Sequence, residues 1–312
     1  MRARHPFSEQ YLHDVFDRQI RDDVFRKATI SRRPLTIFLG GQPGAGKTRG
    51  QNLAIALHPS ESPIKIIGDD LRQYQDDYWE LIEKHPLEMP DATKQSSGTW
   101  IAMCVAEANR QGYSIVIEGT WRNANTVLDE ARNAKDLERR THAVIMAVPK
   151  ELSRISILER YYKDRLDGKP SRWTPLAAHD ETVKGLYSSV KQIADDSAID
   201  RFTIVDRNGT CLFDETDMGI RRKHGAEIWF KHHDRTLTDD ELSQVKKQLS
   251  IVELGLRDDG IDNPEAEQVI RDTKALVMSK RETLSLIKER AEQRLANQDD
   301  SPIILVTPKY KR

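Results

Sequence analysis

Cysteine is scarce in this chain: only two of its 312 residues are cysteines. Cys104 and Cys211 lie far apart and form no metal-binding or redox spacing. The scarcity excludes a disulfide-stabilised secreted scaffold and favours a reduced, cytoplasmic setting. Cys104 stands in an apolar stretch with helical spacing, so we expect it in the core.

Long apolar runs are also missing. No stretch approaches the roughly 18 apolar residues of a membrane span, and the N-terminus lacks the apolar region of a signal peptide. The net charge is only −1, with a pI near 6.8, which gives no overall electrostatic attraction for nucleic acid. We therefore expect a soluble protein with neither a membrane nor a nucleic-acid partner, built as one large domain or one domain with an appendage.

The clearest motif is a glycine-rich loop with the pattern G-x-x-x-x-G-K-T. It consists of Gly41, Gln42, Pro43, Gly44, Ala45, Gly46, Lys47 and Thr48. The apolar run 35–39 before it reads as a buried strand, and residues 49–57 after it suit a helix. A chance match in a glycine-rich turn would lack this strand–loop–helix context, so the segment is interpreted as a phosphate-binding loop.

Each part of this loop has a chemical role. Glycines lack a Cβ, so backbone N–H groups can close around phosphate oxygens, and the following helix adds partial positive charge. We expect Lys47 to reach the β- and γ-phosphates of a bound nucleotide, and the Thr48 hydroxyl to hold Mg²⁺.

A second strand is predicted over 64–67, and the acidic pair Asp69 and Asp70 follows it. Ligands of open parallel sheets collect at the carboxyl ends of the strands, which would place this pair opposite the phosphate loop. One carboxylate could then accept a proton from a substrate hydroxyl. The alternative is a helix N-cap, a position that aspartate also favours.

A third strand, 114–117, runs into Glu118, followed by Thr120 and Arg122. An acid at the end of an apolar strand is the usual place for a carboxylate that orients Mg²⁺ through water, and we expect Thr120 and Arg122 on the same rim. The alternative for Glu118 is a salt-bridged strand end.

A fourth strand, 143–148, leads into a helix that begins near Lys150 and carries Arg160. A polar loop follows, and basic residues cluster along it: Lys163, Arg165, Lys169 and Arg172. Such a loop resembles a lid whose guanidinium groups neutralise a transferring phosphoryl group, although a solvated charge run would look similar. A fifth strand, 202–205, then turns at Asn208-Gly209 into an antiparallel edge, 211–213.

The two ends of the chain have helical patterns. Residues 6–25 form an amphipathic pattern that either packs on the core or contacts a partner. Thr238 and Glu241 make a capping box that opens a helix to Leu254, and a charge-dense helix is predicted over 263–295 with a stripe of Leu276, Leu284 and Ile287. The tail ends in an extended, basic segment, 302–312. It could pack on the core, bind a partner or support self-association.

Six segments occur in a fixed order: 39–48 (LGGQPGAGKT), 68–72, 117–122 (IEGTWR), 152–161 (LSRISILERY), 172–180 (RWTPLAAHD) and 207–214. Together they resemble the zeta toxins of the epsilon/zeta toxin–antitoxin systems. The phosphate loop alone is generic, but the ordered set is much more specific. The resemblance implies transfer of the γ-phosphate of ATP or GTP to a hydroxyl of UDP-N-acetylglucosamine, which blocks peptidoglycan synthesis. It also implies a helical antitoxin that covers the nucleotide site.

The implied fold class is α/β: a P-loop kinase with a central, mainly parallel five-stranded sheet flanked by helices, as in nucleotide kinases. Residues 34–215 would form this core, with the lid around 160–175. Residues 1–33 would add an N-terminal helix, and 216–312 a helical C-terminal extension.

The resemblance also assigns roles to residues. Asp69 matches the catalytic base, and Arg160 and Arg172, together with Lys47, would stabilise the transferred phosphoryl group. The expected substrate-binding residues are Asp69, Arg72, Glu118, Thr120 and Arg122. The expected metal residues are Thr48 and, through water, Glu118.

Two departures from the family pattern fall on the acceptor side. Ala102 stands where the family carries a substrate-contacting glutamate, and Gln75-Asp76 replaces a His-Pro pair. They motivate a second hypothesis, a kinase of the same fold with another acceptor such as a nucleotide, NAD or an antibiotic. A third hypothesis is a nucleotide-dependent binding module with the C-terminal helices as its effector.

Overall fold

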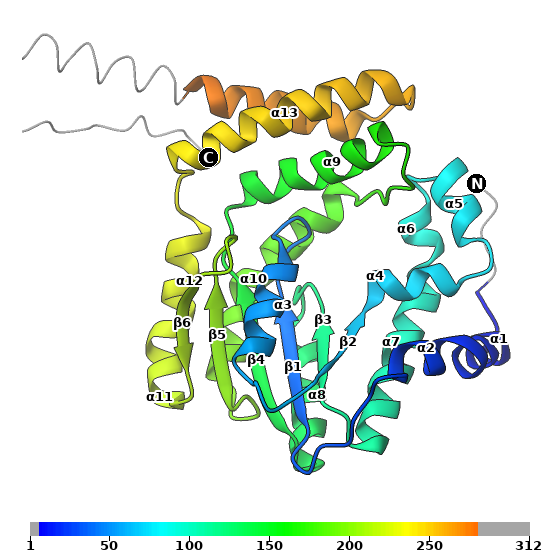
Figure 1. Ribbon diagram of the computed structural model, residues 1–312. Coiled ribbons are helices and arrows are strands. Elements are labelled where there is room, and N and C mark those ends of the chain that lie inside the picture. Colours follow the sequence, from blue (N-terminus) through cyan, green and yellow to red (C-terminus); the bar gives the residue numbers. More distant parts are fainter. Residues whose placement is uncertain (1–5, 280–312) are drawn as a thin grey trace, which may run out of the picture.

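The computed structural model describes residues 6–279, which form a twisted sheet with helices on both faces (Figure 1). The sheet has six strands in the order β2-β3-β1-β4-β5-β6. The strands are β1 (Leu35–Gly40), β2 (Ile64–Ile67), β3 (Ile115–Glu118), β4 (Arg140–Met146), β5 (Arg201–Val205) and β6 (Cys211–Glu215).

Five of these strands are parallel, and β6 runs antiparallel to β5. The parallel strands are joined by helical crossovers, whereas β5 and β6 are joined by a tight turn in which Gly209 has a φ of 88°. The predicted α/β class is confirmed. The sheet has one strand more than the five expected, because the predicted hairpin edge pairs along β5 as a full strand.

Apolar side chains of the central strands fill a core on each face. On one face, Leu35, Ile37 and Leu39 pack with α3 (Lys47–Ala56) and α9 (Lys150–Leu166). On the other, Phe38 and residues of β4 pack with α8 (Ala124–Asp136) and α10 (Leu176–Asp195). Burial on both faces explains why the sequence is almost continuously apolar over 35–39 of β1 and over 143–146 of β4, whereas β4 begins three residues earlier than predicted, with Arg140, Thr141 and His142.

The N-terminal segment covers the β2 side of the sheet. Its predicted helix is a run of three helical pieces, α1 (Glu9–Val15), η1 (Phe16–Ile20) and α2 (Arg21–Phe25). They pack on α7 (Lys94–Gln111), where Trp100 Nε1 donates to the Leu12 carbonyl at 3.0 Å. Short helices join β2 to α7: α4 (Gly68–Leu71), η2 (Arg72–Tyr74), α5 (Tyr78–Lys84) and α6 (Met89–Ala92).

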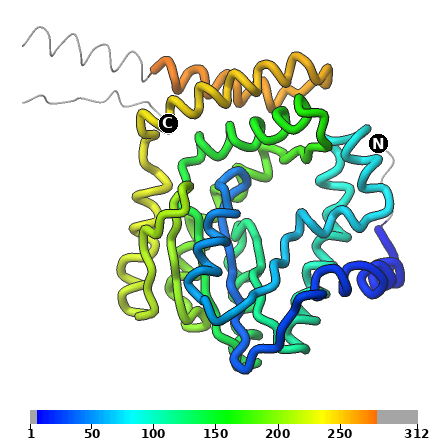
Figure 2. Tube along the Cα trace, viewed as in Figure 1, coloured from blue at the N-terminus to red at the C-terminus, as the bar shows by residue number. Residues whose placement is uncertain are grey.

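The C-terminal extension begins with three helical pieces that were not predicted: α11 (Met218–Ile220), η3 (Arg221–Gly225) and α12 (Ala226–His233). Next comes α13 (Asp239–Asp259), and its predicted capping box, Thr238 with Glu241, is confirmed. Residues 264–279 are helical and run beside α13 above α9, as Figure 2 shows. An ion pair of 2.5 Å joins Lys274 Nζ in this segment to Glu253 Oε1 in α13.

Part of the predicted apolar stripe can be placed. Leu276 packs against the core, whereas Leu284, Ile287 and the segment 302–312 lie outside the described residues. Cys104 is buried as expected, and Cys211 is exposed.

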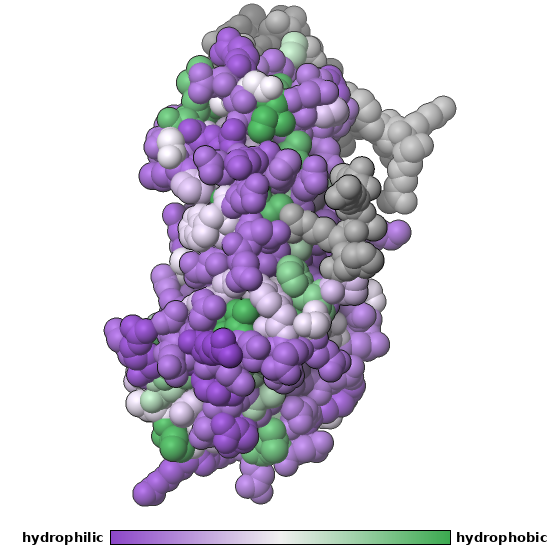
Figure 3. Space-filling view, turned by 90° about the vertical axis from the view of Figure 1, so that its right-hand side faces the viewer, coloured by the Kyte–Doolittle hydropathy of each residue, from purple (hydrophilic) through white to green (hydrophobic). Residues whose placement is uncertain are grey.

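The face shown in Figure 3 is mostly polar, with apolar side chains in small separate patches. Among residues 6–279, no helix has both the length and the apolar character needed to cross a bilayer.

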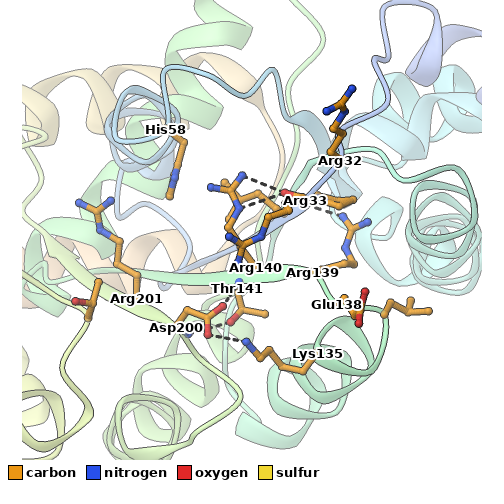
Figure 4. Close-up of a pocket in the computed structure, with 14 residues that line it drawn as sticks. Arg32, Arg33, His58, Lys135, Glu138, Arg139, Arg140, Thr141, Asp200 and Arg201 are labelled. Atoms are coloured by element: carbon orange, nitrogen blue, oxygen red, sulfur yellow. Dashed lines mark hydrogen bonds and ion pairs between the residues drawn. The ribbon is translucent and has the colours of Figure 1, made fainter.

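A cavity of about 880 Å³ lies at the amino-terminal ends of β1, β4 and β5 (Figure 4). Its cationic lining residues are Arg32, Arg33, Lys135, Arg139, Arg140 and Arg201. Several of them are neutralised locally, since Lys135 pairs with Asp200 at 2.7 Å and Arg140 pairs with Glu61. At its wall, His58 Nε2 lies 2.9 Å from Nδ1 of the fully buried His142.

A matched pair of glycine substitutions tests the packing of α13 on α9. Alanine at an open helical site stabilises by up to about 1 kcal/mol relative to glycine, and Gly98 in α7 has no atom within 4 Å of the position of a new Cβ. At Gly255 in α13, the new Cβ would lie 2.4 Å from Tyr162 Cβ. We expect Gly98→Ala to raise the free energy of unfolding, and Gly255→Ala to lower it by about 1–3 kcal/mol, in urea titrations. Equal effects of the two would contradict the packing.

His142 should make stability depend on pH. Burial, followed by the charges of His58 and Arg201, lowers its pKa from 6.5 to about 3. Between these values the unfolded chain binds the proton and the folded chain does not, so stability falls as the pH falls below about 6.5. By pH 5 this loss is about 2 kcal/mol. We expect the free energy of unfolding of His142→Gln to fall less between pH 7 and pH 5 than that of the wild type. An equal fall in the two proteins would contradict the role of His142.

Candidate active site

The register of the parallel strands brings the predicted site residues to one edge of the sheet. Leu39 of β1 and Ile67 of β2 both pair with Glu118 of β3. The phosphate loop follows β1 and Asp69 follows β2, so both lie beside Glu118. A cavity of about 810 Å³ opens at this edge.

Most of the predicted site residues line this cavity. From the predicted set, its walls include Pro43, Gly44, Gly46, Lys47, Thr48, Asp69, Arg72, Glu118, Thr120, Arg160 and Arg172. The remaining residues of the loop are buried and are not part of the cavity lining: Gly41, Gln42 and Ala45.

The conformation of the loop depends on its glycines. Gly44 and Gly46 have φ values of 78° and 77°, a region that side chains other than glycine rarely adopt. A Cβ on Gly44 would lie 2.1 Å from the carbonyl oxygen of Ser153 in α9, so the loop rests directly on that helix. Gly46 is the N-cap of α3, which leaves the first N–H groups of the helix available to an anion.

Asp69 is held between two arginines. Arg72 Nε lies 3.1 Å from Asp69 Oδ1, and an Arg172 guanidinium nitrogen lies 3.1 Å from Oδ2. Burial raises the pKa of Asp69, but Arg172, Arg72, Arg160 and Lys47 together outweigh burial and hold the pKa below its ordinary value. Asp69 is therefore an ionised carboxylate in the cavity, as a proton acceptor must be.

Glu118 and Thr48 offer oxygen ligands beside the loop lysine. Lys47 Nζ lies 3.6 Å from Glu118 Oε1 and donates to the Gly41 carbonyl at 3.3 Å. Within the described part of the chain, no group of three or more His, Cys, Asp or Glu side chains could hold a metal on its own. A few oxygen ligands beside a phosphate site fit Mg²⁺, which keeps several waters and binds through substrate phosphates.

The predicted lid contributes two arginines to the cavity. Arg160 extends from α9 and donates to Thr174 Oγ1 at 3.1 Å, while Arg172 extends from the loop after α9. The loop is anchored, because Trp173 is only 5% exposed and its ring lies 5.1 Å from that of Tyr161.

The other basic residues of this region form ion pairs outside the cavity lining. Lys163 and Lys169 each pair with Asp167 at 3.3 Å, and Arg165 pairs with Asp259. The alternative of a solvated charge run therefore describes Lys163 and Lys169.

Arg122 is a predicted substrate residue that the structure places elsewhere. It is outside the cavity lining, its side chain is half exposed, and it lies 3.8 Å from Glu181. The reason is the preceding residue: Trp121 has a φ of 57° and is buried against Gly40, which turns the chain away from the rim.

Ala102, the departure on the acceptor side, also lies off the cavity wall and is exposed. The lining residues of α7 are Ser97 and Ile101, which are four positions apart and share one helix face. The acceptor side therefore has an apolar and a hydroxyl side chain from this helix.

A buried hydrogen-bond chain below the phosphate loop was not predicted. Gln42 Nε2 donates to the Val148 carbonyl at 2.7 Å and to Ser153 Oγ at 3.3 Å. Ser153 Oγ lies 2.8 Å from His179 Nε2, and His179 Nδ1 lies 2.8 Å from Asp180 Oδ1. Burial lowers the pKa of His179, so the ring is neutral, with Nδ1–H donated to the carboxylate and Nε2 accepting from Ser153.

Along these hydrogen bonds the side chains follow each other as Ser, His and Asp, as they do in the triads of hydrolytic enzymes. Ser153 and His179 are, however, both fully buried. No substrate can reach the hydroxyl, so the array is structural and anchors Gln42. No spacing in the sequence indicated it, because it joins two helices and a loop.

Arg207 is a second cavity residue that was not assigned a role. It follows β5, lines the cavity and donates to the Gly44 carbonyl and to Ser156 Oγ, both at 2.7 Å. Only its place within the segment 207–214 hinted at it.

The family model described as zeta toxin matches residues 20–217, which is more than half of the chain. The chain belongs to the zeta toxin family. Similar proteins include Toxin PezT of Streptococcus pneumoniae, 29% identical over 78% of this chain and 92% of that protein. Toxin zeta of Streptococcus agalactiae is 28% identical over 66% of this chain and 72% of its own length.

The fold of this zeta toxin also has a solved counterpart. A structure from the study of the PezAT chromosomal toxin–antitoxin system of Streptococcus pneumoniae superposes with a TM-score of 0.63 and 24% identity. It covers 81% of this chain and 97% of that chain, which shows a shared fold. The family match ends at residue 217, before most of the C-terminal extension.

The buried array can be tested by removing one hydroxyl. Ser153→Ala leaves His179 Nε2 without its donor, and an unsatisfied buried polar group costs about 1–3 kcal/mol. We expect the free energy of unfolding in urea to fall by that amount. Ser250→Ala, an exposed hydroxyl on α13, should change it by less than about 0.5 kcal/mol. Nitrogen NMR should show His179 as the neutral Nδ1–H tautomer, and the opposite tautomer would contradict the assigned direction of the chain.

Proposed function

We propose that this zeta toxin is a kinase that transfers the γ-phosphoryl group of ATP or GTP to a hydroxyl of UDP-N-acetylglucosamine. The observation that carries the proposal is the placement of Asp69, an ionised carboxylate, in one cavity with Lys47 and the glycine loop. A base, a phosphate cradle and nearby arginines are the parts that phosphoryl transfer needs.

In the proposed reaction, Asp69 takes the proton of the acceptor hydroxyl. The acceptor oxygen bonds to the γ-phosphorus, the bond to the bridging β–γ oxygen breaks, and the nucleoside diphosphate leaves with that electron pair. Lys47, Arg160 and Arg172 balance the charge on the moving phosphoryl group. Mg²⁺, held by Thr48 and through water by Glu118, would neutralise phosphate charge.

The two arginines beside Asp69 give it a second property. By keeping the carboxylate ionised, they also make it a weak base, which suits a loose transition state in which the proton leaves late. Phosphoryl transfer therefore depends more on position and charge than on base strength.

The acceptor is supported by the family, and the cavity also motivates a second candidate. Ala102 stands where the family pattern has a substrate-contacting glutamate and lies off the wall, so α7 contributes only Ser97 and Ile101 to the cavity. A site that reads a hydroxyl needs polar partners to reject analogues. The second candidate is therefore a kinase of the same fold with a different small-molecule acceptor, such as a nucleotide, NAD or an antibiotic.

We also propose a helical antitoxin partner that covers the nucleotide site. The support is the toxin–antitoxin system named for the solved relative, together with an open cavity whose cationic lining includes Lys65, Arg72 and Arg207. A nucleotide-dependent binding module is the remaining hypothesis, and a carboxylate placed as a base argues against it.

Product analysis tests the proposal. Wild-type protein incubated with ATP, Mg²⁺ and UDP-N-acetylglucosamine should yield a phosphorylated sugar nucleotide by mass spectrometry. Asp69→Asn should lower turnover at least about 10²-fold because the proton acceptor is lost, while ATP still binds. Lys47→Ala should lower turnover and also weaken ATP binding.

A metabolite extract supplied in place of the sugar nucleotide separates the candidates. If another compound is phosphorylated and UDP-N-acetylglucosamine is not, the result would favour the second candidate, a kinase with a different acceptor. ATP hydrolysis without any phosphorylated product would favour the binding module, and a fully active Asp69→Asn would remove the base from the mechanism.

A further inference from the structure

The C-terminal helix α13 lies on the outer side of α9, the helix that also forms one wall of the cavity (Figure 1). Val245, Leu249 and Val252 of α13 are buried in the same core as Leu158 and Tyr162 of α9. The family match ends before α13 begins, so nothing in it gives this helix a role in the site.

One polar side chain of α13 passes through this apolar contact. Gln248 is 1% exposed, and its Nε2 donates to Ser156 Oγ at 3.0 Å and to Glu159 Oε2 at 2.5 Å. Ser156 and Glu159 both belong to α9, and both line the cavity. Gln248 therefore contacts two cavity residues from behind.

The orientation of the Gln248 amide is fixed by charge. Its NH₂ group faces the Glu159 carboxylate, and a flipped amide would place Oε1 against that negative charge. Ser156 is also fully used, since its hydroxyl donates to the Leu152 carbonyl at 2.7 Å and accepts from Gln248 and Arg207. The three side chains have only one consistent arrangement of hydrogen bonds.

This arrangement continues to the phosphate loop. The Arg207 guanidinium that donates to Ser156 also donates to the Gly44 carbonyl at 2.7 Å. Its Cγ lies 3.9 Å from the position a Cβ would have on Gly46. A continuous chain of hydrogen bonds thus joins α13 to the loop: Gln248, Ser156, Arg207 and Gly44.

We propose that α13 is a working part of the nucleotide site, and that Gln248 is a positioning residue that holds Arg207 on the phosphate loop. Gln248 keeps the Glu159 carboxylate on its own amide and away from the Arg207 guanidinium. Without Gln248, Glu159 is free to pair with Arg207 and draw it off the Gly44 carbonyl, because opposite charges in a partly buried site attract strongly. The inference rests on the proposed nucleotide binding at this loop.

Two further contacts fix α13 so that Gln248 has a defined position. Gly255 packs directly on Tyr162, where a side chain would not fit. At the far end of α9, Arg165 pairs with Asp259, whose side chain is 2% exposed. These contacts hold α13 in one register along α9.

The test measures the affinity of the full chain for a non-hydrolysable ATP analogue by calorimetry. Gln248→Met removes the amide and keeps a similar length, and we expect the Kd to rise about tenfold, the equivalent of about one hydrogen bond. The matched control is Gln244→Met, an exposed glutamine one turn earlier on α13, which should leave the Kd unchanged. Thermal unfolding establishes that each variant is folded, and Ser156→Ala breaks the same chain from α9 if Gln248→Met does not fold.

A double-mutant cycle separates positioning from packing. If Gln248 acts through Arg207, the double variant Gln248→Met, Arg207→Met should bind no more weakly than Arg207→Met alone. Additive losses, or a Gln248→Met variant that binds like the wild type, would overturn the proposal. A wild-type chain that binds no nucleotide would instead overturn the proposed function, and this inference with it.

Discussion

The direct contact between the phosphate loop and α9 is the constraint on which the rest of the site depends. Gly44 lies so close to the Ser153 carbonyl that no side chain fits between them. The loop can therefore take its shape only when α9 is correctly placed. The same helix carries Arg160 into the cavity, so one packing contact sets the distance between the phosphate cradle and the arginine beyond it.

Charge in the cavity is arranged around this contact. Cations come from three parts of the chain: Lys47 from the loop, Arg72 from the segment after β2, and Arg160 and Arg172 from α9 and the loop that follows it. Their combined effect on Asp69 outweighs its burial. A site with an excess of positive charge is prepared for a polyanion, and it is least stable when that anion is absent.

The sequence predicted the parts of this site that follow from strand order. Parallel strands bring their carboxyl ends to one edge, so the glycine loop, Asp69 and Glu118 could be placed together without coordinates. Arg122 could not, because the left-handed backbone of Trp121 is invisible to a spacing argument. The contact of Ser153 with His179 and the contacts of Gln248 with Ser156 and Glu159 could not be predicted from the sequence either. Each joins side chains on different helices, and local pattern carries no information on such pairs.

The C-terminal extension shows the same limit at the level of elements. The helix that begins at Thr238 was predicted because its capping box is a local signal. The helices from Met218 to His233 were missed, since they are short and owe their stability to buried anchors such as Trp229, which is fully buried in the core. Local signals predict where a long helix begins, but short helices depend on what they pack against.

The crowding of α9 has a consequence for how this protein can change during evolution. One side of the helix faces the cleft through Ser156, Glu159 and Arg160, and the other is buried beneath α13 through Leu158 and Tyr162. Few positions on α9 are free of contacts, so we expect substitutions in this helix to be accepted mainly together with a compensating substitution in a residue that it contacts. The α7 wall of the cavity is constrained less by side-chain hydrogen bonds: Ser97 donates to the Gly68 carbonyl at 2.7 Å, whereas Ile101 makes only apolar contacts, so divergence in substrate choice is easier at Ile101.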